Sequence, residues 1–526
     1  MVTDIETLSP FELSLYLEQR VPLSERADWL DAGRGNPNWT APIPRAAYFL
    51  LGAFATQETL QGDSTRIAGQ ITDQADQLTR FQTFLTAHPG DGAQFLAECL
   101  AQPHLLGMPA SQWLTKACDA IIGDNYPAPA RCLNVVAQPL KTYLNQELFA
   151  NRTLDFDVFP VEGGTAGICY LFDTLMHTHL LDPGDRIALF LPTFAPYLEI
   201  PQLPQYHFDV VKIRAKQVEV AGQTRYQYEL GELDKLRDPR IKAAFVVNPS
   251  NPTANAMSAQ TLAILQKIVN DARPDLLILT DDVYGTFVPH FMSIFAALPY
   301  NTACLYSFSK YFGATGWRVG AIAIAQHNVF DDQIRRLNGA AKEQVRARYA
   351  SLSPDPEAIH FIDRLVADSR DIALHHAAGL STPQQLMIAL FSLYGLLQDG
   401  ASYQQEVIGI CRQREALLFE ALGLPPADPH LDSAYYVDID LLKWVTQRYG
   451  KAFAKAIERH SSPTQLLVQL AQRKHLLLLK TSPFGSDAWS VRISLANLAT
   501  RQYQAVGARI IALFDELKRQ WVKKEA

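Results

Sequence analysis

The sequence predicts an α/β protein with a mostly parallel central sheet flanked by helices, and a smaller α+β domain built from both ends of the chain. Three observations predict this fold class. Between about residues 155 and 330, short runs rich in Val, Ile, Leu and Phe recur between turn signals, which is typical of strands buried on both faces. Helical stretches separate several of these runs. The two ends of the chain instead combine helical periodicity with isolated strand-like runs.

The central region contains six strand-like runs. In chain order they span residues 186–192, 207–213, 241–249, 276–284, 302–310 and 320–325. Stretches with helical periodicity lie between several of them, at 166–180 and 258–272. Because ligands of such sheets bind beyond the carboxyl ends of the strands, we expect the chemistry at that edge.

The two ends of the chain show a different pattern of predicted elements. Residues 1–125 show helical periods at 11–19 and across about 70–100, with few strand signals. After about residue 385 the order is a helix at 384–398, strand-like runs at 430–440, 476–479 and 489–495, and a closing helix from about 500. We therefore predict an N-terminal arm and part of a small domain, with a helical insertion, over 1–125, a large domain over 126–383, and the rest of the small domain over 384–526.

Composition excludes several classes of protein. The chain has 526 residues, with 54 acidic against 47 basic side chains and a net charge of −7, so nucleic acid is not an expected partner. A content of 48% hydrophobic and 19% charged residues excludes disorder over the whole length. The N-terminus lacks the pattern of a secretory signal, and no apolar run approaches the roughly 18–20 residues that span a bilayer. We therefore expect a cytoplasmic protein with reduced thiols and no membrane partner. The six cysteines form no Cys-x-x-Cys pair, so we also expect no metal site.

A glycine-rich turn precedes the first central helix. Gly163 and Gly164 follow an apolar run, and Thr165 follows them. Glycines at a helix start allow backbone N–H groups to approach an anion closely, and Thr165 adds a hydroxyl donor, so the turn can bind phosphate. Glycine pairs are also common at ordinary strand-to-helix turns, and both interpretations stay open on this turn alone.

Lys310 comes directly after a strand-like run, within SFSKYFGATGWRVG at 307–320. At the end of a buried strand, partial desolvation would lower the pKa of the amine toward that of a nucleophile able to form a Schiff base. The alternative is a surface lysine in a loop, which would be the better interpretation of an isolated lysine.

Three motifs in the same order resemble those of the fold-type I pyridoxal phosphate enzymes of the aspartate aminotransferase superfamily. They are the segment around Lys310, NPSNPT at 248–253 and DDVY at 281–284, and the resemblance covers roughly residues 30–500. It implies the fold-type I transferase fold and pyridoxal 5′-phosphate as cofactor.

The resemblance assigns catalytic and cofactor-binding roles. Lys310 is implied to bind the cofactor as a Schiff base and to move the proton at the substrate Cα. Asp281 would keep the cofactor ring nitrogen protonated, so that the ring acts as an electron sink. Tyr284 and Asn251 would bind the 3-hydroxyl oxygen of the cofactor, with Asn251 also contacting substrate. Phe194 would stack on the ring.

The phosphate and the substrate have their own implied ligands. Tyr126 is implied to reach the phosphate from a neighbouring subunit, so the active site would need at least a dimer. Arg492 matches the arginine that binds the substrate α-carboxylate, although a salt bridge at a strand edge would also explain it. The remaining phosphate ligands are implied to be Gly163, Gly164, Thr165, Ser307 and Arg318.

Departures from the ordinary pattern indicate a subgroup. The chain is longer than ordinary members, with the excess near 50–120 and in a helical stretch near 340–380, and it carries LDAGRGNPNW at 30–39. This combination resembles the aspartate 4-decarboxylase subgroup, which also transaminates aspartate. The resemblance implies conversion of L-aspartate to L-alanine and carbon dioxide through a ketimine, with side transamination that uses 2-oxo acids. It also implies a homo-oligomer, at least a dimer and up to a dodecamer. The alternative is a plain aminotransferase acting on aspartate or another amino acid.

The ligand of the distal substrate carboxylate is left open. A tight clamp would stabilise a charge that decarboxylation must remove, so a looser contact is expected. We expect Gly35 and Arg34 near the entrance to the substrate site. There, Arg34 either contacts the distal carboxylate or forms a salt bridge in the loop. Ser14 stands where the subgroup's PFEL segment is usually followed by lysine. His177 and His179 cannot share a helix face, so we interpret them as packing residues rather than metal ligands.

Overall fold

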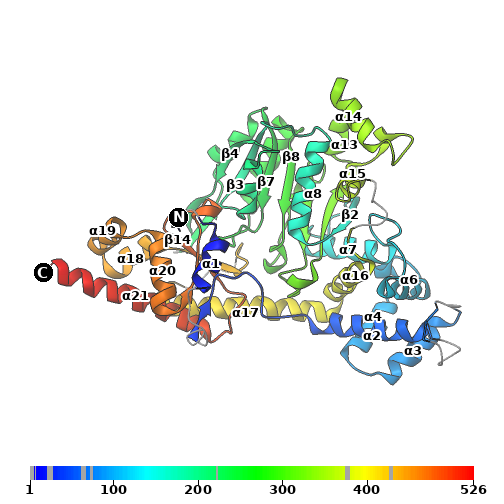
Figure 1. The fold of residues 1–526 in the computed structure, drawn as a ribbon, viewed down its shortest axis with the longest axis horizontal. Helices are drawn as coiled ribbons and strands as arrows, with labels where there is room; N and C mark the ends of the chain where they lie inside the picture. The colour runs from blue at the N-terminus through cyan, green and yellow to red at the C-terminus, as the bar shows by residue number, and fades with distance from the viewer. Residues whose placement is uncertain are drawn as a thin grey trace.

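The computed structural model of the chain is shown in Figure 1. It describes residue 5 and residues 8–19, 28–60, 67–70, 75–220, 223–372, 379–425 and 430–525.

A seven-stranded sheet forms the centre of the molecule. Its strand order is β2-β10-β9-β8-β7-β3-β4. Neighbouring strands from β9 to β4 run parallel, while β10 runs antiparallel to both β9 and β2. The predicted α/β fold with a mostly parallel sheet is confirmed. The strands are β2 (Phe156–Val161), β3 (Arg186–Leu191), β4 (Asp209–Arg214), β7 (Ile241–Val247), β8 (Leu277–Asp281), β9 (Thr302–Ser307) and β10 (Gly320–Ala325).

All six predicted runs contain a strand, but two features differ from the prediction. β4 is not buried on both faces, because it lies at an edge of the sheet and most of its side chains are at least partly exposed. β2, at the other edge, was not among the predicted strands. Asp157 and Pro160 interrupt its apolar run, and an edge strand accommodates a proline because one side of it needs no hydrogen bonds.

Helices cover both faces of this sheet. On one face, α8 (Gly164–His177), α13 (Val329–Arg336), α14 (Gly339–Tyr349) and α15 (Phe361–Asp368) share a core with alternate strand residues such as Phe245. On the other face, α11 (Ala259–Ala272) packs against the intervening residues, such as Ala244. The alternation of strand residues between two cores is what a sheet covered on both faces requires.

The N-terminal helices after residue 41 pack against the large domain. They share one core with α7 (Asn134–Glu147) and α16 (Thr382–Leu396), and they form the end of the molecule at the lower right of Figure 1. These helices lie within residues 1–125, where the sequence leads us to expect a helical insertion. The helices are α2 (Pro42–Glu58), α3 (Gln77–Ala87), α4 (Asp91–Leu100), α5 (Pro103–Leu106) and α6 (Ala110–Ile122).

The small domain draws its core from both ends of the chain. Leu13 and Leu17 of α1 (Pro10–Glu18) are buried with residues of the C-terminal helices. Its antiparallel sheet has the order β11-β14-β13, and β1 (Leu30–Asp31) pairs with β12. Helix α17 (Gln398–Leu422) runs along the molecule from α16 to this domain (Figure 1). The other elements are β11 (Tyr436–Asp440), α18 (Leu441–Tyr449), α19 (Lys451–His460), α20 (Pro463–Lys474), β12 (Leu476–Leu477), β13 (Leu479–Lys480), β14 (Ser490–Ser494) and α21 (Gln502–Glu525).

A two-stranded hairpin, β5 (Lys216–Val220) and β6 (Gln223–Gln227), leaves the central sheet after β4. It reaches the small domain, where the Tyr226 hydroxyl donates to Asp438 of β11 over 3.0 Å. The sequence analysis did not predict this hairpin, because its strands are mostly polar and carry no apolar run.

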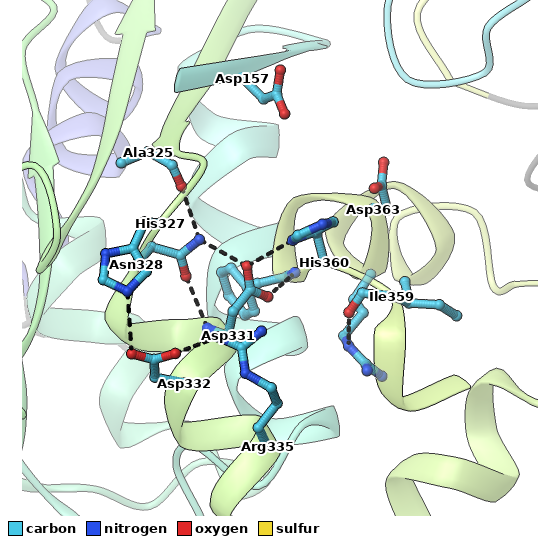
Figure 2. A network of polar contacts seen from close by, with 12 residues as sticks. Asp157, Ala325, His327, Asn328, Asp331, Asp332, Arg335, Ile359, His360 and Asp363 are labelled. Atoms are coloured by element: carbon cyan, nitrogen blue, oxygen red, sulfur yellow. Dashed lines mark hydrogen bonds and ion pairs between the residues drawn. The ribbon is translucent and has the colours of Figure 1, made fainter. Parts of the chain in front are cut away.

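Helix α15, in the extra length expected near 340–380, is attached to α13 through Asp331 (Figure 2). This buried carboxylate accepts from the backbone N–H of Phe361, at the start of α15, over 2.6 Å. It also accepts from the Asn328 amide over 2.8 Å and pairs with His360 over 3.0 Å. Asn328 in turn caps α13 by accepting from the Asp331 N–H over 2.8 Å. One side chain therefore joins two helix starts.

Within the described ranges, no helix is long and apolar enough to cross a membrane. The same residues contain no group of three or more His, Cys, Asp or Glu side chains placed to hold a metal ion. His177 and His179 instead lie near Asp368 and Asp182, at 3.7 and 2.7 Å. The six cysteines are free thiols, and five of them are buried.

Candidate active site

A cavity of about 280 Å³ lies beyond the carboxyl ends of β7, β8 and β9, where the small domain approaches the sheet. The end of β8 contributes Asp281, and the turn after β9 contributes Lys310. β14 of the small domain contributes Arg492. The cavity is thus formed where the sequence analysis expected the chemistry. The sequence-predicted residues that line it are Gly35, Gly164, Thr165, Phe194, Asn251, Asp281, Tyr284, Ser307, Lys310, Arg318 and Arg492.

One end of the cavity is suited to an anion. It contains the N-terminus of α8, whose cap residue Gly163 has φ +85° and offers no side-chain cap. A Cβ at Gly163 would lie 2.6 Å from Nη2 of Arg318, so glycine is needed for this close approach. The Arg318 guanidinium donates to backbone oxygens, those of Thr315 and Glu162, and no carboxylate pairs with it among the described residues. The free N–H groups of a helix start and an unpaired guanidinium favour a phosphate here.

Asp281, the last residue of β8, is a buried residue of the cavity wall. It is 6% exposed, and burial raises its pKa to about 7, with the neighbouring Asp282 adding to the rise. The Val283 N–H and the Tyr197 hydroxyl donate to it, each over 3.3 Å. Because these two long hydrogen bonds do not offset its desolvation, a cation placed against this carboxylate would be strongly favoured. A protonated ring nitrogen is such a cation.

Lys310 also lines the cavity. Its Nζ donates to the backbone oxygen of Gly35 over 3.0 Å. Burial lowers the pKa of Lys310, and the positive charges of Arg492 and Arg318 lower it further, against the opposing effects of Tyr436 and Asp281. The amine is therefore easier to deprotonate than an ordinary lysine, which a nucleophile or a base requires. The alternative of an exposed loop lysine is wrong.

Arg492 is a buried cation with unused donors. It is 2% exposed, and it donates to Asn251 Oδ1 over 2.9 Å and to the Gly33 backbone oxygen over 2.8 Å. Its Nε has no partner, and none of the ion pairs described involves it. Among the described residues, Arg492 therefore forms no salt bridge at a strand edge. A buried guanidinium in a cavity wall without a carboxylate is suited to a carboxylate of the ligand.

Tyr284 and Phe194 occupy the remaining walls. Tyr284 is 3% exposed, and its hydroxyl oxygen lies 3.1 Å from that of Tyr436. Phe194 is half-buried and lines the cavity. An aromatic wall and two hydroxyls complete a site for a flat, polar ring.

Of the sequence-predicted residues, Gly163 adjoins Arg318 without lining the cavity, and Tyr126 and Arg34 lie outside it. Tyr126 is 73% exposed and lines a different cavity, together with Asn125 and Leu133. Arg34 pairs with Glu18 over 2.9 Å and with Asp31 over 2.8 Å, so within the chain it forms the salt bridge that the sequence analysis kept as its alternative.

Sequence reasoning missed four polar residues of the site. Tyr197 donates to Asp281, while Asn36, Thr315 and Tyr436 line the cavity. Thr315 lies within the motif around Lys310 and could have been found there. Tyr197 and Tyr436 belong to no motif that the sequence analysis used, and only the folded chain places them here.

Comparison with known proteins agrees with this geometry. The model of the family "Aminotransferase class I and II" matches residues 158–510. A "Bifunctional aspartate aminotransferase and L-aspartate beta-decarboxylase" from a Pseudomonas species is 43% identical over 523 residues, covering 98% of both chains. Among solved structures, a mutant aspartate aminotransferase of Thermus thermophilus is similar with a TM-score of 0.58 and 16% identity, over 96% of this chain and 97% of that one. The aromatic aminotransferase of Pyrococcus horikoshii gives a TM-score of 0.57 at 16% identity, over 96% and 99%. The chain belongs to the class I and II aminotransferase family.

Proposed function

We propose that this protein converts L-aspartate to L-alanine and carbon dioxide, as a 4-decarboxylase with aspartate aminotransferase side activity. The observation that carries the proposal is the cavity that combines Lys310, Asp281 and the unpaired Arg492. The Pseudomonas relative, whose printed name includes both activities, supports the choice of substrate and reaction.

Pyridoxal 5′-phosphate is the cofactor of this family, and the residues present fit it. The start of α8 with Thr165, Ser307 and Arg318 would hold the phosphate, and Asp281 would hold the protonated ring nitrogen. When bound, the cofactor supplies an electron sink that stabilises negative charge at the substrate Cα.

The chain's own groups bind the substrate and move its protons. Arg492 binds the α-carboxylate through guanidinium donors that no protein carboxylate uses. Lys310, once its amine is free and neutral, takes the proton from Cα and returns protons to the product. Asp281 keeps its negative charge next to the ring nitrogen, because a paired cation offsets the cost of its burial.

The distal carboxylate of aspartate is expected to meet a weak contact. The cations that line the described cavity are Lys310, Arg318 and Arg492, and each has a role elsewhere in the site. Without a dedicated arginine clamp, the negative charge of the distal carboxylate is less stabilised, and its loss as carbon dioxide is less opposed. This supports decarboxylation over a reaction that ends at transamination.

Aspartate alone tests the proposal. Purified holoenzyme supplied with L-aspartate and no 2-oxo acid is expected to release alanine and carbon dioxide continuously, far beyond one equivalent per site. A single stoichiometric turnover that yields oxaloacetate would show a plain aminotransferase instead. Lys310→Ala is the control, because it removes the amine that both reactions need.

We also propose that the protein is a cytoplasmic homo-oligomer, at least a dimer and up to a dodecamer. Tyr126 supports a shared site, because it is exposed and outside the cavity of its own chain. Free thiols, five of them buried, are compatible with a reducing compartment.

A further inference from the structure

Tyr436, the first residue of β11, contacts two groups that the proposed function uses. Its hydroxyl oxygen lies 3.1 Å from the hydroxyl oxygen of Tyr284. The Cζ atom of Arg492 lies 4.2 Å from the centroid of its ring. Tyr436 is 3% exposed and lines the cavity. Tyr436 therefore contacts both Tyr284, which the proposed function assigns to the cofactor, and Arg492, which it assigns to the substrate.

The N-terminal segment encloses the Tyr436 hydroxyl. A Cβ at Gly35 would collide with that hydroxyl, so the backbone can pass at this distance only as glycine. The Gly35 backbone oxygen itself accepts from Tyr435 over 2.8 Å and from Lys310 over 3.0 Å. Tyr436 is thus confined between Gly35 and Tyr284, and its described hydrogen bond is the one to Tyr284.

At this distance, one of the two hydroxyls donates its hydrogen to the oxygen of the other. Burial raises the pKa of Tyr284 well above its ordinary value, and the neighbouring phenols Tyr436 and Tyr435 add to the rise, so Tyr284 keeps its proton. If Tyr436 donates, the hydrogen of Tyr284 is free to point into the cavity. If Tyr284 donates to Tyr436, only a lone pair of Tyr284 faces the cavity.

We propose that Tyr436 is a positioning residue that acts on both halves of the site. Its hydroxyl donates to Tyr284 and so directs the Tyr284 hydrogen toward the 3-hydroxyl oxygen of the cofactor. Its ring holds the Arg492 guanidinium in place for the substrate α-carboxylate. The inference rests on the proposed function, because that proposal assigns the cofactor and carboxylate positions.

Two variants separate the two effects. Tyr436→Phe keeps the ring and removes the hydroxyl. The 3-hydroxyl oxygen of the cofactor then accepts a weaker hydrogen bond from Tyr284 and becomes more basic, so the pH midpoint of the cofactor's visible absorbance rises by about half a unit or more. Tyr436→Met fills much of the space without an aromatic face, and it weakens binding of maleate, a four-carbon dicarboxylate without an amino group, about fivefold or more. Tyr436→Phe leaves maleate affinity within about twofold.

The experiment is a spectrophotometric pH titration of holoenzyme, with and without maleate. Tyr228→Phe is the matched control, because Tyr228 is a buried tyrosine outside the cavity, in the core between the sheet and α11. The control keeps both the wild-type midpoint and the wild-type maleate affinity.

An unchanged midpoint in Tyr436→Phe overturns the proposed role of the hydroxyl, even if the variant melts at a lower temperature. Unchanged maleate affinity in Tyr436→Met overturns the proposed role of the ring. If Tyr436→Met does not fold, a change in maleate affinity beyond twofold in Tyr436→Phe overturns the division between ring and hydroxyl. Neither measurement needs turnover, so wild-type protein that fails to convert aspartate refutes the proposed function while these results still test Tyr436.

Discussion

Asp281 and Lys310 show how burial prepares single residues for chemistry. The pKa of the Asp281 carboxyl is raised and that of the Lys310 amine is lowered, in both cases mainly because burial disfavours the charged form. For Asp281 this is a cost to the protein without its cofactor. A cation bound against the carboxylate removes that cost, so cofactor binding and ionisation of Asp281 favour each other.

This coupling predicts a pH effect on the stability of the cofactor-free protein. The pKa of Asp281 rises from 3.8 to about 7 on folding, so the folded state binds the proton more tightly than the unfolded state. Its contribution to stability is therefore present below about pH 4 and is lost as the pH rises toward 7. Asp281→Asn, which does not titrate, is expected to show a smaller fall in melting temperature between pH 4 and 7. A parallel fall in wild type and variant, measured by thermal unfolding of cofactor-free protein, would contradict this role of burial.

The residues that could be predicted are those within contiguous motifs. Asp281 ends β8, Lys310 lies in the turn after β9, and both have characteristic neighbours along the chain, so sequence alone indicates them. Tyr436 and Tyr197 have no such neighbours, because their importance comes from contacts with Tyr284 and Asp281, which are distant along the chain. Arg34, in contrast, lies in a recognisable segment of the sequence. That segment did not reveal that Glu18 and Asp31 pair with Arg34.

At the scale of elements, strands were predictable where burial imposes an apolar run. β7, β8 and β9 lie inside the sheet, their side chains are almost all buried, and most of their residues are apolar. The hairpin of β5 and β6 was not predictable, because its pairing depends on hydrogen bonds with few apolar residues. The run at 476–479 became two short strands, β12 and β13, which pair in different sheets. A local pattern does not specify which partner strand is available.

The attachment of α15 and α13 through Asp331 gives a prediction about stability. Asp331→Ala leaves the Phe361 N–H, the Asn328 amide and His360 without this acceptor, and it is expected to lower the free energy of unfolding by about 3 kcal/mol. Urea denaturation measures the change.

The neighbouring Asp332 provides the control. It pairs with the exposed Arg335 and accepts from Tyr300 over 2.7 Å, so Asp332→Ala is expected to cost about 1 kcal/mol or less. Equal losses in the two variants would show that Asp331 is not the main attachment of α15. The decarboxylation rate of folded Asp331→Ala protein should be unchanged, since the network lies outside the cavity.

At the scale of the whole molecule, the proposed oligomer can be tested by subunit complementation. If Tyr126 completes the phosphate site of a neighbouring subunit, a hybrid dimer of Lys310→Ala and Tyr126→Ala chains contains one site with both residues intact. Co-expression of the two chains is then expected to restore about a quarter of wild-type activity when assembly is random. Activity equal to the mean of the two parent variants would place Tyr126 outside any shared site.

The sequence by itself determined the fold class, the family, and the residues whose chemistry is encoded in local motifs. Apolar runs predict strands because burial acts on each run separately, and a motif places its residues at the end of one strand. Only the tertiary structure decided that α2 to α6 pack against the large domain, and that Tyr436 of β11 meets Tyr284 and Arg492. These contacts join segments far apart along the chain, and they depend on which surfaces remain to be buried once the local elements have formed.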